Sequence, residues 1–193
     1  MMMMMEDDRP SLAQGEFKMH SQAEYFLELG SSSGNIIELV DESRLSDESQ
    51  WFSHLGFDVM LLSNELIERI PVIREINAIA EVDRVVVLSM PAYSTYNWHT
   101  DDHRNATVNL LINNHDNSHC LFGEPLDENR SSFLELKYKP NTFYLFNTKR
   151  QHMVINRGER RYMMSLQFNS ELGYIDIRDE WLDSNSLSSL KAS

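Results

Sequence analysis

Two histidines and one aspartate are the residues of this sequence best suited to bind a metal ion. His99 and Asp101 are separated only by Thr100. In a β-strand, residues i and i+2 point to the same face, so this imidazole and this carboxylate could reach one ion together, whereas Asp102 would point away. With 7 histidines and 30 acidic residues, roughly one His-x-Asp/Glu motif arises by chance. Taken alone, the pair is therefore explained better by a surface loop than by a metal site.

A second segment further along the chain strengthens this hypothesis. His152 begins a short β-prone run, a turn follows at residues 157–159, and Arg161 begins the next run. The pattern predicts a β-hairpin that places Arg161 on the strand beside His152. Two imidazoles and one carboxylate form the ligand set of non-haem Fe(II) sites, which leaves one side of the ion open. The planar fork of an arginine can pair with a carboxylate.

Together these residues resemble the signature of the Fe(II)/2-oxoglutarate-dependent dioxygenase superfamily. The spacing from His152 to Arg161 is similar to that of the prolyl hydroxylases. The stretch 99–112, with Arg104 shortly after the aspartate, also resembles the aspartyl/asparaginyl hydroxylases. The resemblance covers about residues 84–168, and it indicates the superfamily better than the subfamily.

The resemblance implies a ligand set and a reaction. His99, Asp101 and His152 would bind Fe(II), 2-oxoglutarate would chelate this iron, and Arg161 would pair with the distal carboxylate of 2-oxoglutarate. With O2, such an enzyme oxidises a substrate C–H bond and releases succinate and CO2. We expect a hydroxylase that acts on an amino acid, either free or within a peptide.

Several neighbours of these motifs are further candidates for the site. Asn109 and Tyr144 could contact the cosubstrate, although a structural hydrogen bond or core packing would explain them as well. Tyr96, Trp98 and Arg104 are candidate substrate-binding residues.

Two positions around the arginine leave alternatives open. Arg160 competes with Arg161, because strand alternation turns only one of them inward, and we expect Arg161. Some relatives carry a serine two residues after the arginine, where this chain has Met163. Ser165 should share the inward face and could line the pocket.

The distribution of charge narrows the class of ligand. The net charge of −13 disfavours binding to nucleic acid, whose phosphates it would repel. The segment 149–161 is locally basic, which fits either a small anionic ligand or a solvated loop.

Short β-prone runs separated by turn residues fill residues 84–168, as is typical of a sandwich or barrel. Before them, residues 63–80 predict a helix with one apolar face that is kinked or split at Pro71, and residues 36–40 predict a short strand. The predicted fold class is α+β and mainly β. The resemblance implies a double-stranded β-helix (jelly-roll, cupin-like) with N-terminal supporting helices.

At 193 residues the chain suits one domain. We expect a disordered tip at 1–15, one oxygenase domain at 16–183 and a polar tail at 184–193. Cys120 is the one cysteine, so no intrachain disulfide can form, and its apolar neighbours predict a plain buried thiol in a cytoplasmic protein. No apolar run reaches the roughly 18 residues of a membrane span.

Other functions remain open. The same fold could serve as a non-catalytic, cupin-like module that binds a metal or a ligand. The same site could also perform desaturation or demethylation, although the negative charge argues against nucleobases. Halogenation is disfavoured, because Asp101 occupies the position that a halide would need.

Overall fold

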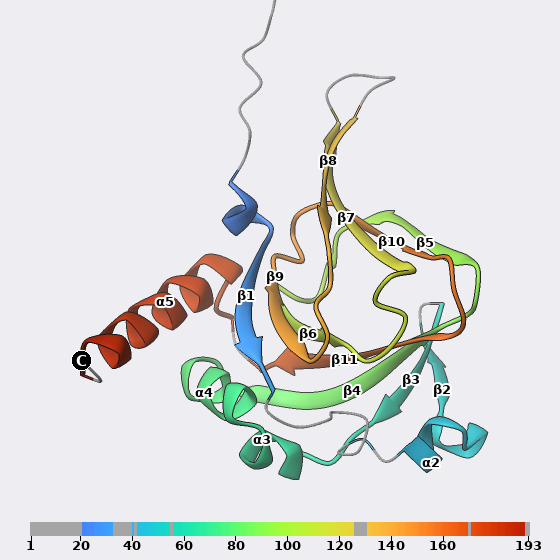
Figure 1. The fold of residues 1–193 in the computed structure, drawn as a ribbon, viewed down its shortest axis with the longest axis horizontal. Helices are drawn as coiled ribbons and strands as arrows, with labels where there is room; N and C mark the ends of the chain where they lie inside the picture. Colours follow the sequence, from blue (N-terminus) through green and yellow to red (C-terminus); the bar gives the residue numbers. More distant parts are fainter. Residues whose placement is uncertain are drawn as a thin grey trace, which may run out of the picture.

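Two antiparallel β-sheets face each other, and helices cover the outer side of the larger sheet (Figure 1). This computed structural model describes residues 21–32, 40, 42–54, 56–125, 131–169 and 171–191. The larger sheet has seven strands, in the spatial order β1 (Phe26–Ser31), β9 (Thr142–Phe146), β6 (Thr107–Leu111), β11 (Arg161–Phe168), β4 (Val82–Met90), β3 (Phe57–Leu61) and β2 (Phe52–His54). The smaller sheet has four, in the order β5 (Ser94–His99), β10 (His152–Asn156), β7 (Ser118–Pro125) and β8 (Ser131–Leu136).

The chain alternates between the sheets, which makes the fold a double-stranded β-helix. From β4 it crosses to β5 in the small sheet, returns to β6, crosses to β7 and β8, returns to β9, and crosses again through β10 to β11. The predicted fold class is therefore confirmed. The described helical segments are η1 (Gln22–Glu24), α2 (Glu42–Leu45), η2 (Glu48–Gln50), α3 (Glu65–Arg69), α4 (Pro71–Ile79) and α5 (Tyr174–Lys191).

Pro71 divides the predicted helix into α3 and α4, as expected. It stands at the first position of α4, where its missing N–H and restricted φ are tolerated. Ile73 and Ile76 of α4 are fully buried against the large sheet, together with Val85 and Val87 of β4. Burial of this apolar face provides the main stabilisation of so short a helix.

A second apolar cluster fills part of the space between the two sheets. Its members include Phe122 of β7 and Tyr144 and Phe146 of β9. The Phe122 ring lies 5.3 Å from that of Phe146 and 5.7 Å from that of His152. Aromatic side chains therefore fill the interior as far as the ring of His152.

The sequence prediction placed His152 and Arg161 on paired strands, and this prediction is wrong. β10 pairs with β5 and β7, whereas β11 pairs with β4 and β6, so the two strands lie in opposite sheets. The turn after β10 crosses from one sheet to the other. Because packed sheets lie only about 10 Å apart, an inward arginine on β11 still enters the space that His152 faces.

Other differences concern the ends of the chain. The prediction omitted β1, β2, β3 and α5, whose sequences show no clear period. Residues 184–191, expected as a polar tail, belong to α5. The expected tip at 1–15 and all of the expected strand 36–40 except Val40 lie outside the described residues. None of the helices that the structure describes is long and apolar enough to cross a bilayer.

Candidate metal centre

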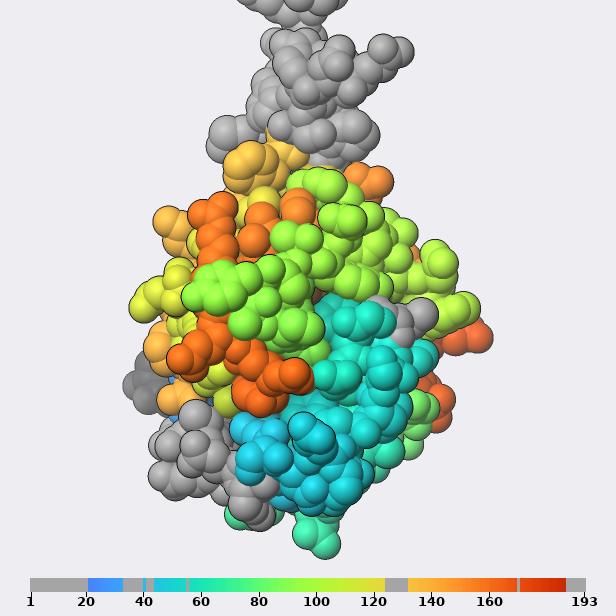
Figure 2. Space-filling view, turned by 90° about the vertical axis from the view of Figure 1, so that its right-hand side faces the viewer, coloured from blue at the N-terminus to red at the C-terminus, as the bar shows by residue number. Residues whose placement is uncertain are grey.

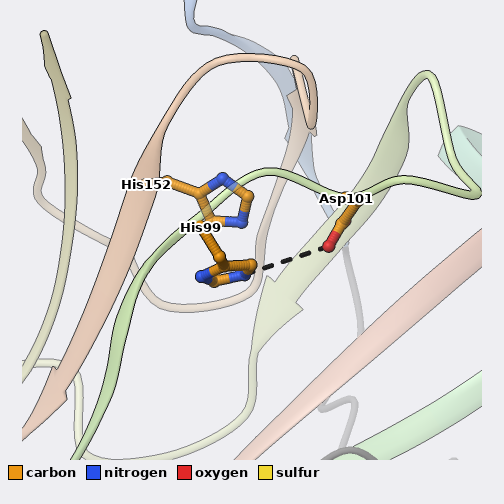
Figure 3. Close-up of side chains that lie close together, drawn as sticks. All are labelled: His99, Asp101 and His152. Atoms are coloured by element: carbon orange, nitrogen blue, oxygen red, sulfur yellow. Dashed lines mark ion pairs between the residues drawn. The ribbon is translucent and has the colours of Figure 1, made fainter.

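The ends of two neighbouring strands bring the histidines together. His99 is the last residue of β5, His152 is the first residue of β10, and the two are direct partners in the small sheet. Their ring centroids lie 4.1 Å apart. With Asp101 they form a group whose ligand atoms all lie within 4.8 Å of one another, and Figure 3 shows the three side chains turned toward one centre.

Strand alternation does not place Asp101, contrary to the sequence argument. β5 ends at His99, so Asp101 lies in the following loop. The loop is positioned instead by a hydrogen bond from the Asp101 backbone N–H to the carbonyl of Thr148, at 2.9 Å. As a result, Oδ1 of Asp101 lies 3.9 Å from Nε2 of His99 (dashed line in Figure 3).

In each of the two histidines, a hydrogen bond at one ring nitrogen leaves the other ring nitrogen available to a metal. Nδ1 of His99 donates to the carbonyl of Asn97 at 2.7 Å, and Nδ1 of His152 donates to the carbonyl of Arg150 at 2.9 Å. A carbonyl only accepts, so each Nδ1 carries the proton and each Nε2 lone pair is available. Burial lowers the pKa of His152, which favours the neutral imidazole that metals bind. The donor set therefore fits Fe(II), which takes two imidazoles and one carboxylate.

Arg161 lies in the same interior and is almost completely buried, with 1% of its surface exposed. Its Nε donates to the Ser118 hydroxyl at 2.6 Å, and its Nη2 donates to the Tyr138 hydroxyl at 3.3 Å and contacts the Met163 sulfur at 3.1 Å. Within the described part of the chain, no carboxylate pairs with this guanidinium. A buried charge without a counterion is costly, so the arrangement suits an anionic ligand.

Arg160 points the other way. Its Nη1 lies 2.9 Å from Oδ2 of Asp58 and 3.1 Å from the Ser89 hydroxyl, on the outer side of the large sheet. The side chains of the basic segment 149–161 therefore lie in different surroundings. Lys149 donates to the carbonyls of Asp101 and Asp102, and Arg161 alone enters the interior. Of the two arginines that competed in the sequence, the structure thus brings only Arg161 to the space between the sheets.

Asn109 of β6 and Tyr144 of β9 are direct partners in the large sheet and lie side by side on its inner face. Asn109 is 3% exposed, and its Oδ1 has no hydrogen-bond partner among the described residues. The Tyr144 hydroxyl accepts from the backbone N–H of Lys139 at 3.2 Å, which leaves its own proton available. Ser165, the partner of Asn109 on β11, bonds to the Thr107 hydroxyl at 3.0 Å.

Of the three predicted substrate-side residues, two border the metal centre. The Tyr96 ring stands edge-on to that of His99 at 4.3 Å, and Nη2 of Arg104 lies 2.7 Å from Oδ2 of Asp101. Trp98 is 40% exposed and covers Gly123, where an added Cβ would lie 2.7 Å from the indole. Gly123 follows the inward Phe122, so this contact lies on the outer side of the small sheet.

The surroundings of Tyr96 extend to β3 of the large sheet, the strand next to the edge strand β2. Its ring lies 4.6 Å from that of Phe57, at the start of β3. Figure 2 shows the face on which the β2–β3 segment (cyan), the segment around β5 (green) and the β10–β11 segment (orange) meet. The metal centre is therefore bordered by segments that are distant in the sequence.

Three residues of the site were missed by the sequence prediction. Ser118 and Tyr138 hold Arg161, and Thr148 holds the loop of Asp101. Ser118 could have been found from strand alternation, since it shares the inward face with Cys120 and Phe122. Tyr138 follows β8, and Thr148 lies in a turn, so no periodic pattern indicates their direction.

A scan against models of protein families gives no match, and a search of curated proteins gives none either. Solved structures do match the fold. A prolyl-4-hydroxylase from Pseudomonas putida aligns with a TM-score of 0.55 and 15% identity over 74% of this chain and 91% of that one. A prolyl hydroxylase from Trichoplax adhaerens, solved with a hypoxia inducible factor peptide fragment, aligns with a TM-score of 0.51 and 15% identity over 80% of this chain and 86% of that one. The chain therefore has a fold similar to that of these prolyl hydroxylases.

Proposed function

We propose that this protein is an Fe(II)- and 2-oxoglutarate-dependent oxygenase that hydroxylates an amino acid, free or within a peptide. One observation carries the proposal. A preformed His-Asp-His group and a buried arginine, with which no carboxylate of the described residues pairs, face the same space between two sheets. A dicarboxylate that chelates the metal at one end and pairs with the arginine at the other end would satisfy both the metal group and the buried charge.

His99, Asp101 and His152 would hold the iron through Nε2, one carboxylate oxygen and Nε2. Bound there, iron supplies O2 activation coupled to decarboxylation of 2-oxoglutarate to succinate and CO2, with oxidation of a C–H bond. The protein contributes orientation, because the carbonyls of Asn97 and Arg150 fix both imidazole rings and their tautomers.

Arg161 would bind the distal carboxylate of 2-oxoglutarate. The Ser118 hydroxyl accepts a hydrogen bond from Nε, and the Tyr138 hydroxyl and the Met163 sulfur accept from Nη2, so the N–H groups of Nη1 remain. Charge-assisted hydrogen bonds from Nη1 would hold the carboxylate. The side-chain amide of Asn109 and the hydroxyl of Tyr144 are further donors for the cosubstrate on the inner face.

The substrate would enter beside Tyr96, the aromatic residue that touches His99. The choice of an amino acid or peptide is supported by the two prolyl hydroxylases of similar fold, one of which was solved with a peptide. The net charge of −13 argues against a nucleic acid substrate.

The test is a titration of anaerobic protein with Fe(II) and then 2-oxoglutarate, monitored by visible absorption. We expect a metal-to-ligand charge-transfer band that is absent from Asp101→Ala. Correctly folded wild-type protein without a band would contradict the proposal.

A second measurement separates the alternatives. On admission of O2, candidate amino acids and peptides should stimulate succinate release, and mass spectrometry should show one added oxygen atom in the substrate. A band without stimulated succinate release for any substrate would favour a non-catalytic binding module. A product that has lost hydrogen would indicate desaturation.

A further inference from the structure

The loop that carries Asp101 is fastened to the turn that precedes His152. Asp101 donates its backbone N–H to the carbonyl of Thr148 at 2.9 Å, and the Thr148 hydroxyl donates to the carbonyl of Arg104 at 2.6 Å. Thr148 is 1% exposed, so its hydroxyl has little access to water as an alternative partner. One residue thereby holds both ends of the loop 101–104.

The two oxygens of the Asp101 carboxylate have different neighbours. Oδ2 receives Nη2 of Arg104 at 2.7 Å, whereas Oδ1 faces Nε2 of His99 at 3.9 Å. The Asp101 side chain is 15% exposed and that of Arg104 is 31% exposed, so this pair is only partly solvated. A charge-assisted bond of this length restricts rotation of the carboxylate.

We infer that Thr148 and Arg104 are positioning residues for the third metal ligand. Thr148 sets where the loop runs, and Arg104 occupies Oδ2 so that Oδ1 alone is presented to the metal. The inference rests on the proposed function in one respect, namely that His99, Asp101 and His152 bind a divalent metal.

The need for such residues follows from the fold. His99 and His152 are held by the ladder of the small sheet, but Asp101 lies beyond the end of β5 and has no strand partner. A carboxylate that is free to rotate can also offer both oxygens, which would occupy a position needed by other ligands. Outer partners of metal ligands typically contribute about 10–100-fold to metal affinity.

The first test replaces Thr148 and measures Mn(II) and Co(II) binding to metal-free protein by calorimetry. Thr148→Val keeps the shape and removes the hydroxyl, and we expect affinity to fall about 10–100-fold. Thr148→Ser keeps the hydroxyl and should stay within about threefold of wild type. Circular dichroism of the metal-free variants establishes that the fold is retained. Equal affinity of the valine variant and wild type, or equal weakness of the serine and valine variants, would contradict a role for the hydroxyl bond.

The second test replaces Arg104. Arg104→Met should weaken Mn(II) and Co(II) binding about 10–100-fold and change the visible spectrum of the Co(II) protein, because the carboxylate can then turn both oxygens to the metal. Arg104→Lys should recover part of the affinity and the wild-type spectrum. The matched control is Arg84→Met, which removes an arginine paired with Asp83 on the surface and should change neither.

The two levels of the hypothesis fail in different ways. Wild-type protein that binds neither Mn(II) nor Co(II) would overturn the proposed function together with this inference. Wild-type protein that binds metal, with Thr148→Val and Arg104→Met binding equally well and with an unchanged Co(II) spectrum, would overturn this inference alone.

Discussion

The two faces of the large sheet are both buried, yet they differ in chemistry. Along β11, Met164 and Leu166 face the helices, whereas Arg161, Met163 and Ser165 face the small sheet. The helix side is an apolar contact with α4. The inner side carries buried polar groups, each of which needs a partner. The period of two in a strand lets the same eight residues stabilise the fold on one side and build a site on the other.

The largest effect is expected from a substitution on the helix side of the large sheet. Ile73→Ala removes a fully buried side chain and should lower the free energy of unfolding by about 2–5 kcal/mol, measured by urea denaturation. Metal affinity of the protein that remains folded should not change. Glu75→Ala, at an exposed position of the same helix, is the control and should stay within about 0.5 kcal/mol of wild type. A loss of metal affinity in folded Ile73→Ala would show that the two faces are coupled.

A second prediction asks whether the polar inner space is closed to solvent. Burial raises the pKa of the Cys120 thiol from 9.0 to about 12. At pH 8 the reactive thiolate is then about 1000-fold rarer than in an ordinary cysteine, so alkylation of native protein should be slower by at least that factor. Mass spectrometry with and without denaturant measures both rates. Rapid labelling of the native protein would show that the interior opens.

The third prediction compares the two adjacent arginines. Arg161→Met should weaken 2-oxoglutarate binding on the order of 100-fold, because the buried pair between the guanidinium and the distal carboxylate is lost. The free energy of unfolding should stay the same or rise, because the variant removes a buried charge with which no carboxylate of the described residues pairs. Arg160→Met removes the outer contacts with Asp58 and the Ser89 hydroxyl and should change binding little. The measurement is a 2-oxoglutarate titration of the charge-transfer band. The opposite result would make Arg160 the anchor.

The smallest effect is expected at a residue that supports the anchor. Tyr138→Phe removes an acceptor of Arg161 but keeps the ring, which lies 5.8 Å from the guanidinium carbon. A hydrogen bond to a charged group is worth about 1.5–3 kcal/mol, and this one is long at 3.3 Å, so 2-oxoglutarate binding should weaken about tenfold. The same titration applies, with exposed Tyr93→Phe as the control. Unchanged binding would indicate that packing alone orients Arg161.

Much of the fold could be predicted from the sequence wherever the pattern was periodic. The β-prone runs 142–146 and 162–168 correspond closely to β9 and β11, and Pro71 marked the boundary between α3 and α4. The edge strand β2, its neighbour β3 and the helix α5 could not be predicted, because their apolar residues follow no regular period. The pairing of strands was also out of reach, since a turn such as 157–160 can close a hairpin or cross between sheets.

The sequence by itself determined which residue types were available for a metal and an anionic ligand, since His99, Asp101, His152 and Arg161 stand out by type and spacing. Only the tertiary structure decided how they meet. His99 and His152 meet as partners in one sheet, and Arg161 comes from the opposite sheet. Asp101 joins them through a loop held by Thr148 and Arg104, not through the strand alternation that first suggested it. The reason is physical: spacing along a chain records local geometry, whereas contacts between sheets and turns depend on the whole fold.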